Sequence, residues 1–260
     1  IYSEGQYVTR DINKAIHYYT LAANQNIPKA QFILGSIYHG GQYVTQDINK
    51  AIHYYTLAAN LNHLKAQFIL GSIYCEGQYV TRDINKAIHY FSLAANQKYP
   101  QAQYNLGVIY SEGQYVTRDI SKAIHYYTLA ADQNFPEAQF NLGNIYRGGQ
   151  YVTRDISKAI YYFTLAANQN MSAAQLNLGK IYDEGQYVKQ DMNKAIYYYS
   201  LAANQNFPEA QFNLGLIYDK GQNVTRDISK AIHYYTLAAN QNIPEAQFNL
   251  GNIYRGGQYV

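Results

Sequence analysis

One stretch is decisive for the fold: residues 28–63 read PKAQFILGSIYHGGQYVTQDINKAIHYYTLAANLNH. The pattern returns every 36 residues without insertion or deletion, and its clearest markers are Gly5, Gly41, Gly77, Gly113, Gly149, Gly185, Gly221 and Gly257. A fixed period of this length is typical of stacked structural repeats. We therefore expect residues 1–260 to form a single array with partial repeats at 1–27 and 244–260 and six complete repeats at 28–63, 64–99, 100–135, 136–171, 172–207 and 208–243.

The first half of each repeat has the pattern of a helix, which we call helix A. Pro28 suits the first turn of a helix, because proline gives up an N–H that has no partner there. Leu34 lies on an apolar stripe at helical spacing, and Gly41 stands where a left-handed residue would end the helix. Helix A is therefore expected over about 28–39.

The second half of the repeat predicts another helix, helix B. Asp47 is a typical N-cap, and the alanines and tyrosines after it cover a broad apolar face, so helix B is expected over roughly 48–60. No run alternates with a period of two, which argues against strands. Neither helix can bury its apolar stripe alone, so neighbouring repeats must stack into a solenoid.

Composition excludes several classes of protein. The chain is 48% hydrophobic and only 14% charged, so it is not a disordered, highly charged segment. The single cysteine, Cys75, excludes an intrachain disulfide framework and a multi-cysteine zinc site. No window approaches the roughly 18 apolar residues of a membrane-spanning helix. The net charge of +3, from 20 basic and 17 acidic residues, does not favour nucleic-acid binding.

The repeat resembles a known family. The pattern A-Q-F-x-L-G-x-I-Y-x-x-G-x-x-V-x-x-D-x-x-K-A-I-x-Y-Y-x-x-A-A-x-Q is similar to the Sel-one-like repeat, and it is carried here by Ala30, Gln31, Leu34, Gly35, Tyr38, Gly41, Val44, Asp47, Lys50, Ala51, Tyr54, Tyr55, Ala58 and Ala59. The resemblance covers the whole chain. It implies an all-α fold, a right-handed, tetratricopeptide-like α/α superhelical solenoid that acts as an adaptor or scaffold.

Two positions depart from the family pattern. The family has a second glycine before the loop valine, where this chain has Tyr43, and a glycine after the final glutamine, where this chain has asparagine, as at Asn26. Both changes are expected to alter loop shape without changing the fold. One secreted branch of the family carries a disulfide in each repeat, and the lone Cys75 excludes that branch.

Motifs for catalysis are missing, so we expect neither an enzyme nor a bound cofactor or metal. The sequence has no phosphate-binding loop, no nucleophile elbow and no H-E-x-x-H pair. One row of histidines is expected on the outward face of helix B, where no adjacent acid or thiol completes a zinc site: His17, His53, His89, His125 and His233.

Paired aromatic residues on helix B have two interpretations. Pairs such as Tyr18 and Tyr19 or Tyr54 and Tyr55 could stack on the bases of single-stranded nucleic acid. Their positions beside the alanines of the buried stripe favour core packing instead, because large side chains fill space well against small ones.

The surface of helix A opposite Leu34 is where the otherwise uniform repeats differ, and the resemblance implies that it lines a concave groove. The candidate groove residues are Phe32, Ser36, His39, Phe68, Ser72, Cys75, Tyr104, Val108, Ser111, Phe140, Asn144, Arg147, Leu176, Lys180, Asp183, Phe212, Leu216, Asp219, Phe248, Asn252 and Arg255. An aromatic spine with a varied polar flank suits a peptide or protein partner. Alternatively, the Phe32 register packs between helices and its flank drifts neutrally.

The sequence favours a non-enzymatic interaction scaffold. The alternatives are the regulatory or targeting region of a larger enzyme and, with less support, a helical RNA-binding array. A start at Ile1 without a signal-peptide pattern suggests a fragment and, with the lone thiol, favours the cytoplasm. The partial repeats at the two ends predict head-to-tail self-association, because Leu250, Ile253 and Tyr254 would be exposed.

Overall fold

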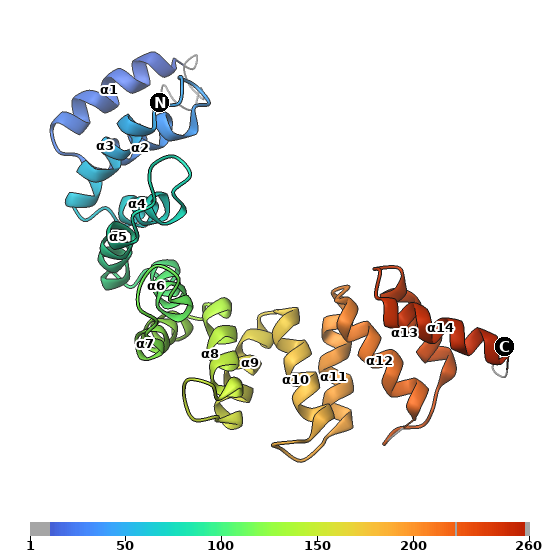
Figure 1. Cartoon of the computed structure of the whole chain (residues 1–260). Coiled ribbons are helices and arrows are strands. Elements are labelled where there is room, and N and C mark those ends of the chain that lie inside the picture. The colour runs from blue at the N-terminus through green and yellow to red at the C-terminus, as the bar shows by residue number, and fades with distance from the viewer. Residues whose placement is uncertain (1–10, 222, 258–260) are drawn as a thin grey trace. The chain divides into compact units, whose positions relative to one another are not determined.

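The computed structural model describes residues 11–221 and 223–257, and every regular element within these ranges is an α-helix (Figure 1). The A helices are α2 (Pro28–Gly40), α4 (Leu64–Glu76), α6 (Pro100–Glu112), α8 (Pro136–Gly148), α10 (Ser172–Glu184), α12 (Pro208–Lys220) and α14 (Pro244–Gly256). The B helices are α1 (Ile12–Asn24), α3 (Ile48–Asn60), α5 (Ile84–Asn96), α7 (Ile120–Ala131), α9 (Ile156–Asn168), α11 (Met192–Asn204) and α13 (Ile228–Ala239). The predicted all-α solenoid of two-helix repeats is confirmed. The loop expected before α1 lies outside the described residues.

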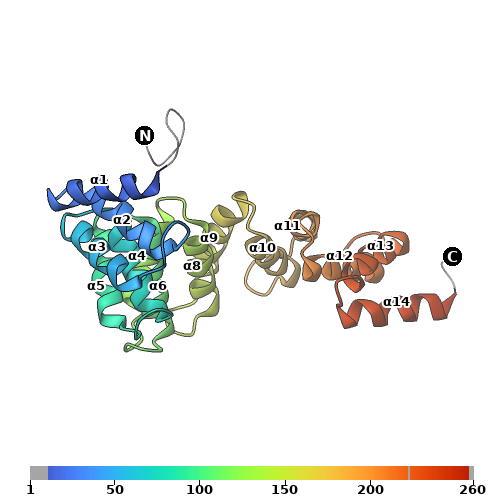
Figure 2. The same cartoon turned by 90° about the horizontal axis from the view of Figure 1, so that it is seen from above.

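The chain divides into two compact units. Unit 1 is Ile1–Gln133 and contains α1 to α7, and unit 2 is Asn134–Val260 and contains α8 to α14. Within each unit, A and B helices alternate along the chain, as Figures 1 and 2 show for the two directions of view.

An aspartate begins each B helix, as the sequence predicts. Asp47 Oδ1 accepts a hydrogen bond from the Lys50 backbone N–H at 3.0 Å, and Lys50 Nζ lies 3.4 Å from Asp47 Oδ2. The bond from the Lys50 backbone N–H holds the pKa of Asp47 below its ordinary value. The six other B helices begin with the same aspartate and lysine.

Left-handed residues end both kinds of helix. Gly41 after α2 has φ 63°, the conformation that glycine adopts without steric cost. The turn after each B helix uses a second left-handed residue, which is Asn26 with φ 59° in the first case. Asparagine tolerates this conformation better than most residues, which explains why the family's glycine can be replaced here. Lys98, with φ 62°, stands at this turn position in one repeat.

The core of each repeat is a large ring packed on a glycine. Tyr55 on α3 is 1% exposed, and a Cβ added at Gly35 on α2 would lie 2.6 Å from its Cδ1 atom. Alanines and Leu34 complete the contact between the helices. Gly35 and its equivalents therefore lie at close helix crossings, and the other pairs are Gly71 with Phe91, Gly107 with Tyr127, Gly143 with Phe163, Gly179 with Tyr199 and Gly215 with Tyr235.

A buried glutamine on helix A joins neighbouring repeats within each unit, and Gln67 on α4 is an example. Gln67 is 1% exposed, and its Nε2 donates to the main-chain oxygen of Ala59, near the end of the preceding B helix, at 3.1 Å. Its Oε1 accepts a hydrogen bond from Nε2 of Gln97, just after the following B helix, at 2.7 Å. This glutamine chain recurs at Gln103 with Gln133, Gln139 with Gln169, Gln175 with Gln205 and Gln211 with Gln241.

The glutamine chain is interrupted at one place. Gln31 donates to the main-chain oxygen of Ala23 at 3.0 Å, but its buried Oε1 accepts no hydrogen bond from any described residue. The donor in the other repeats comes from a glutamine 30 residues later, and position 61 holds a leucine. An unpaired buried carbonyl oxygen loses its bonds to water without replacement.

Two expectations about burial need correction. In the B helices from α3 to α13, only the second aromatic of each pair is fully buried, and the first is half-buried, as at Tyr54. On α1, Tyr19 is half-buried and Tyr18 is 56% exposed. At the other end of the array, Ile253 on α14 is 9% exposed rather than open to solvent, because it packs on the core of α13. Leu250 is half-buried and packs against the same core, whereas Tyr254 is exposed as expected.

Candidate functional site

The last turn of helix A lies against the aromatic core residue of helix B. Tyr199 Oη donates a hydrogen bond to Asp183 Oδ2 at 3.3 Å, and Tyr235 Oη donates to Asp219 Oδ2 at 3.4 Å. In unit 1, the Tyr127 hydroxyl pairs with Ser111 Oγ at 3.0 Å. In unit 1 as well, His39 Nδ1 lies 3.5 Å from Tyr55 Oη. Four predicted groove residues of the His39 register therefore pair with the core tyrosine of their own repeat.

Two repeats have phenylalanine at this core position. Phe91 lies opposite the register of Cys75, and Phe163 lies opposite that of Arg147. A phenylalanine ring offers no hydroxyl group, so neither Cys75 nor Arg147 can form the bond that its equivalents form. Arg147 Nη1 instead donates to Asn177 Oδ1 at 2.6 Å, on the next A helix.

A cavity occurs at equivalent positions between consecutive A helices in both units. It measures about 230 Å³ between α4 and α6. In unit 2 it measures about 290 Å³ between α8 and α10 and about 110 Å³ between α10 and α12. The core residue is Phe91 or Phe163 in the repeats of the two larger cavities and Tyr199 in that of the smallest, and of these three rings Phe91 alone lines its cavity.

The cavity between α4 and α6 is mainly apolar. Phe91 contributes to its wall, together with Ile84, Ile109 and two predicted groove residues, Cys75 and Val108. Burial raises the pKa of the Cys75 thiol, so this side chain stays neutral at pH 7. Polar and charged lining comes from Ser72, Glu76, Asn105, Glu112, Gln114 and Tyr115.

The equivalent cavity between α8 and α10 carries the opposite charge. Its lining includes Arg147, Arg154 and Lys180, against a single carboxylate from Glu184. In this cavity, Arg147 and Lys180 occupy the positions that Cys75 and Val108 hold in the cavity between α4 and α6. Lys180 Nζ also lies 3.9 Å from Glu209 Oε2.

The structure brings seven predicted groove residues to these cavities. Ser72, Cys75 and Val108 line the cavity between α4 and α6, and Arg147 and Lys180 line the cavity between α8 and α10. The remaining two, Asp183 and Leu216, line the smallest cavity.

The aromatic spine is mostly used for packing. Phe32 is half-buried, with its ring 5.8 Å from that of Tyr55 and 4.5 Å from the imidazole of His63. Phe68, Tyr104, Phe140 and Phe212 make the same tilted contact with the core aromatic of their own repeat. Leu176 is 5% exposed.

The other predicted groove residues do not line these cavities. Ser36 Oγ accepts a bond from Tyr55 Oη at 3.4 Å, and Asn144 is half-buried. Phe248, Asn252 and Arg255 are exposed on α14.

Several lining residues were missed from the sequence. Glu76 and Glu112 follow the predicted register by one position, and Tyr115 and Tyr187 come from the loops after helix A. A signal for the first two was present, because a glutamate ends helix A in two consecutive repeats.

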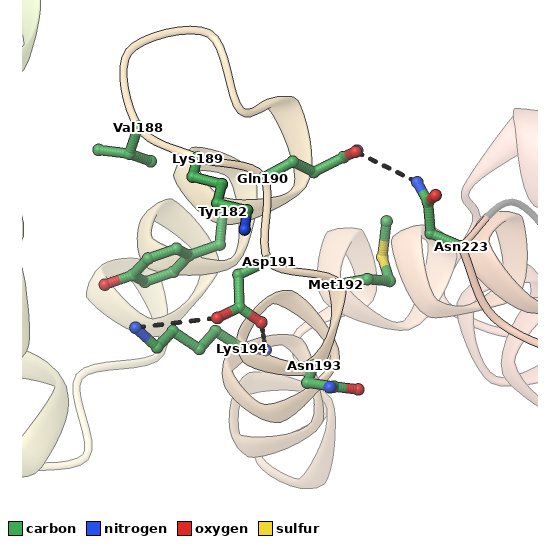
Figure 3. A pocket seen from close by; sticks show the side chains of 9 residues that line it. All are labelled: Tyr182, Val188, Lys189, Gln190, Asp191, Met192, Asn193, Lys194 and Asn223. Atoms are coloured by element: carbon green, nitrogen blue, oxygen red, sulfur yellow. Dashed lines mark hydrogen bonds and ion pairs between the residues drawn. The ribbon is translucent and has the colours of Figure 1, made fainter.

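The cavity in Figure 3 is larger, about 640 Å³, and several of its lining side chains have structural roles. Asp191 caps α11 by accepting from the Lys194 backbone N–H, and Lys194 Nζ lies over the Tyr182 ring, 4.8 Å from its centre. Asn223 Nδ2 donates to Gln190 Oε1 at 3.1 Å. This cavity lies outside the registers of the predicted groove.

Three further observations concern function. The predicted histidines of helix B are exposed, which confirms the outward face. Within the described ranges, no three histidine, cysteine or acidic side chains gather as metal ligands do. Over the same ranges, no helix combines the length and the apolar character needed to cross a bilayer.

Comparison with known proteins identifies the repeat. A family model, Sel1 repeat, matches along the whole chain, at residues 1–27, 28–63, 64–99, 100–135, 136–171, 172–207, 208–243 and 244–260. No curated protein matches the chain.

Two solved structures are similar over nearly all of the chain. One is c5321, a protective antigen present in uropathogenic Escherichia coli strains and displaying an SLR fold, with a TM-score of 0.88 and 33% identity over 100% of this chain and 56% of that chain. The other is a Sel1 repeat protein from Oxalobacter formigenes, with a TM-score of 0.76 and 32% identity over 97% of this chain and 73% of that chain. The present chain thus spans little more than half the length of c5321.

Proposed function

The chain belongs to the Sel1 repeat family, and we propose on that premise that it is a non-enzymatic scaffold or adaptor whose A helices bind a peptide or protein partner. Proteins of this family are generally protein-interaction scaffolds and are typically non-catalytic. The observation that carries the proposal is the recurrence of one cavity with a different lining in different repeats.

The contrast between framework and lining supports this function. The caps, the glycine contacts and the glutamine chain are repeated with few changes, whereas Cys75 and Val108 become Arg147 and Lys180 at equivalent positions. A surface whose shape repeats and whose chemistry changes can recognise successive side chains of one partner. The aromatic spine offers a partner less surface than the sequence pattern predicts, because most of its rings pack on helix B.

Site-specific photo-crosslinking tests the proposal. A photoreactive amino acid would replace Val108 or Lys180 at the cavities, and His89 or His125 on the outward face would serve as matched controls. Crosslinked proteins from the native source would be identified by mass spectrometry. We expect one partner to crosslink from the cavity positions and not from the controls. Equal crosslinking from both faces would contradict the proposed surface.

Two alternatives have separate tests. If the array is the regulatory or targeting region of a larger enzyme, the complete reading frame will encode a catalytic domain as well. If it binds RNA instead, the chain will retain RNA in a manner that weakens with salt. We expect no such retention at the net charge of +3.

Head-to-tail self-association stays a prediction for this 260-residue chain. Phe248 and Tyr254 on α14 are 69% and 57% exposed, and Tyr18 and Leu21 on α1 are 56% and 46% exposed. Light scattering over a range of concentrations tests it, and a monomer throughout would contradict it.

A further inference from the structure

We propose that the cavity between α4 and α6 binds a basic side chain of the partner, lysine or arginine, with the aliphatic stem on its apolar wall and the cationic end between Glu76 and Glu112. The inference rests on the proposed function, which it deepens by naming the chemistry of one partner residue. Basic side chains often bury their methylene groups on apolar surface while their charge stays at the rim.

The wall of the cavity suits an aliphatic stem. Phe91 is 1% exposed, and the cavity is lined further by Ile84, Val108 and Ile109. The neutral thiol of Cys75 adds a polarisable contact without charge. Phe91 also lacks the hydroxyl group with which Tyr127 bonds to Ser111 in the next repeat.

The charge of the lining suits a cation. Glu76 and Glu112 are the two charged side chains among the lining residues, and they are the last residues of α4 and α6. The C-terminal end of a helix carries partial negative charge, which adds to the attraction for a cation. Neither carboxylate forms an ion pair with another described residue.

The two nearby arginines bond to other groups and do not pair with the Glu76 and Glu112 carboxylates. Arg82 Nη2 donates to the main-chain oxygen of Glu76 at 3.1 Å, and its guanidinium lies over the Tyr115 ring, 4.8 Å from the centre. Arg118 Nη2 donates to the main-chain oxygen of Glu112 at 3.0 Å. Neither arginine lines the cavity, so the Glu76 and Glu112 carboxylates remain available to a ligand.

Unit 2 supplies an internal contrast. In the cavity between α8 and α10, Gly148 replaces the first glutamate, and Arg147, Arg154 and Lys180 outnumber the carboxylate of Glu184. The same repeat geometry therefore carries a lining that disfavours a cation. A preference for lysine at the α4–α6 cavity alone would be due to its lining and not to the fold.

Methyl-detected NMR on the full chain tests the inference with small probes. The probes are N-acetyl-lysine methylamide and N-acetyl-norleucine methylamide, which share the aliphatic stem and differ in the ammonium group. We expect the lysine probe to shift the methyl signals of Ile84, Val108 and Ile109 in a saturable way. Affinity for the norleucine probe should be about fivefold lower, which is the effect expected from the loss of one or two partly exposed ion pairs. The methyl signals of Ile156 and Ile181, in the unit 2 cavity, should not show this preference.

Two variants identify the groups responsible. Glu76→Gln with Glu112→Gln should lower the affinity for lysine to that for norleucine, whereas the matched control Glu184→Gln should change neither. Phe91→Tyr should weaken both probes, because its hydroxyl enters the cavity, and tyrosine is already the residue at this position in other repeats. Equal affinity for the two probes in the unmodified chain, or no shift at Ile84, Val108 and Ile109, would overturn the inference.

The test separates this inference from the proposed function. If a crosslinked partner loses affinity on Lys180 substitution but not on the Glu76 and Glu112 double substitution, the inference fails and the scaffold function stands. If no cavity substitution lowers partner affinity, the proposed function fails, and with it the role assigned to the basic side chain.

Discussion

The Tyr199 hydroxyl donates its hydrogen bond to Asp183, 16 residues earlier, and the same spacing joins Tyr55 to His39, Tyr127 to Ser111 and Tyr235 to Asp219. At the two repeats where the ring is phenylalanine, the residue 16 positions earlier is Cys75 or Arg147. The variation along this register is therefore tied to the core residue behind it.

The buried tyrosines are expected to make the free energy of unfolding fall as the pH rises into the alkaline range. Burial, and then the charge of Asp183, raise the pKa of Tyr199 above its ordinary value of 10.0. Above pH 10 the unfolded chain loses this proton while the native chain keeps it, so the free energy of unfolding falls as pH rises. We expect Tyr199→Phe to lessen this fall by up to about 1.4 kcal/mol per pH unit.

Urea unfolding of both chains at pH 8 and pH 11 measures this difference. Tyr161→Phe, at a residue that is 59% exposed, is the control and should leave the fall unchanged. If the free energy of unfolding fell equally between pH 8 and pH 11 in Tyr199→Phe and in the unmodified chain, the pH dependence would not come from the Tyr199 hydroxyl.

The interrupted glutamine chain predicts a stabilising substitution. Leu61→Gln should supply the donor that Gln31 Oε1 lacks and raise the free energy of unfolding by about 1–2 kcal/mol. Conversely, Gln97→Leu should remove the bond to Gln67 and lower the free energy by a similar amount. Denaturant unfolding checks both. Leu61→Ala, which removes the leucine without adding a donor, should give no gain, and an equal gain from it would refute the explanation.

The turn at Lys98 predicts a smaller gain. Its φ of 62° is costly for a lysine, and asparagine occupies this turn position in the six other repeats described. Lys98→Asn should therefore raise the free energy of unfolding by about 1 kcal/mol. Lys98→Ala keeps an unfavourable conformation and should not. Thermal unfolding of the three chains would distinguish the turn conformation from a simple effect of charge removal.

The glycine contact predicts a loss. A Cβ at Gly71 would lie 2.5 Å from Phe91 Cδ1, closer than real side chains approach. Gly71→Leu should force Phe91 to shift and cost about 1–3 kcal/mol. Gly40→Leu is a suitable control, because a Cβ there meets no atom within 4 Å. Unchanged melting temperature in Gly71→Leu would mean that the helix crossing is not where we describe it.

Local chemistry explains why the helices could be predicted from the sequence. Asp47 and Gly41 act on the backbone within a few residues, so their roles as caps follow from residue type and position. The exposure of the Phe32 register could not be predicted in the same way, because an A helix inside a unit, such as α2, is contacted by a B helix on each side. The burial of Ile253 was not predicted either, because α13 alone covers this side chain without a following helix.

The candidate site was predictable only in part. Cys75 and Val108 could be predicted because their positions vary among repeats that are otherwise nearly uniform. Glu76 and Tyr115 were not predicted as lining residues. The expected bounds of helix A leave out its last residue and the loop that follows it. The pairing of Tyr199 with Asp183 depends on how two helices cross, which periodicity within one helix does not contain.

The most direct test of the scaffold function is the affinity of the crosslinked partner, once purified, for three chains: unmodified, Lys180→Glu at a cavity, and His125→Glu on the outward face. Isothermal titration calorimetry would give each Kd, and circular dichroism would verify that helicity is unchanged. The proposed surface predicts that Lys180→Glu weakens binding by about tenfold or more while His125→Glu leaves it unchanged. Equal affinity of all three chains, or a loss confined to His125→Glu, would contradict it.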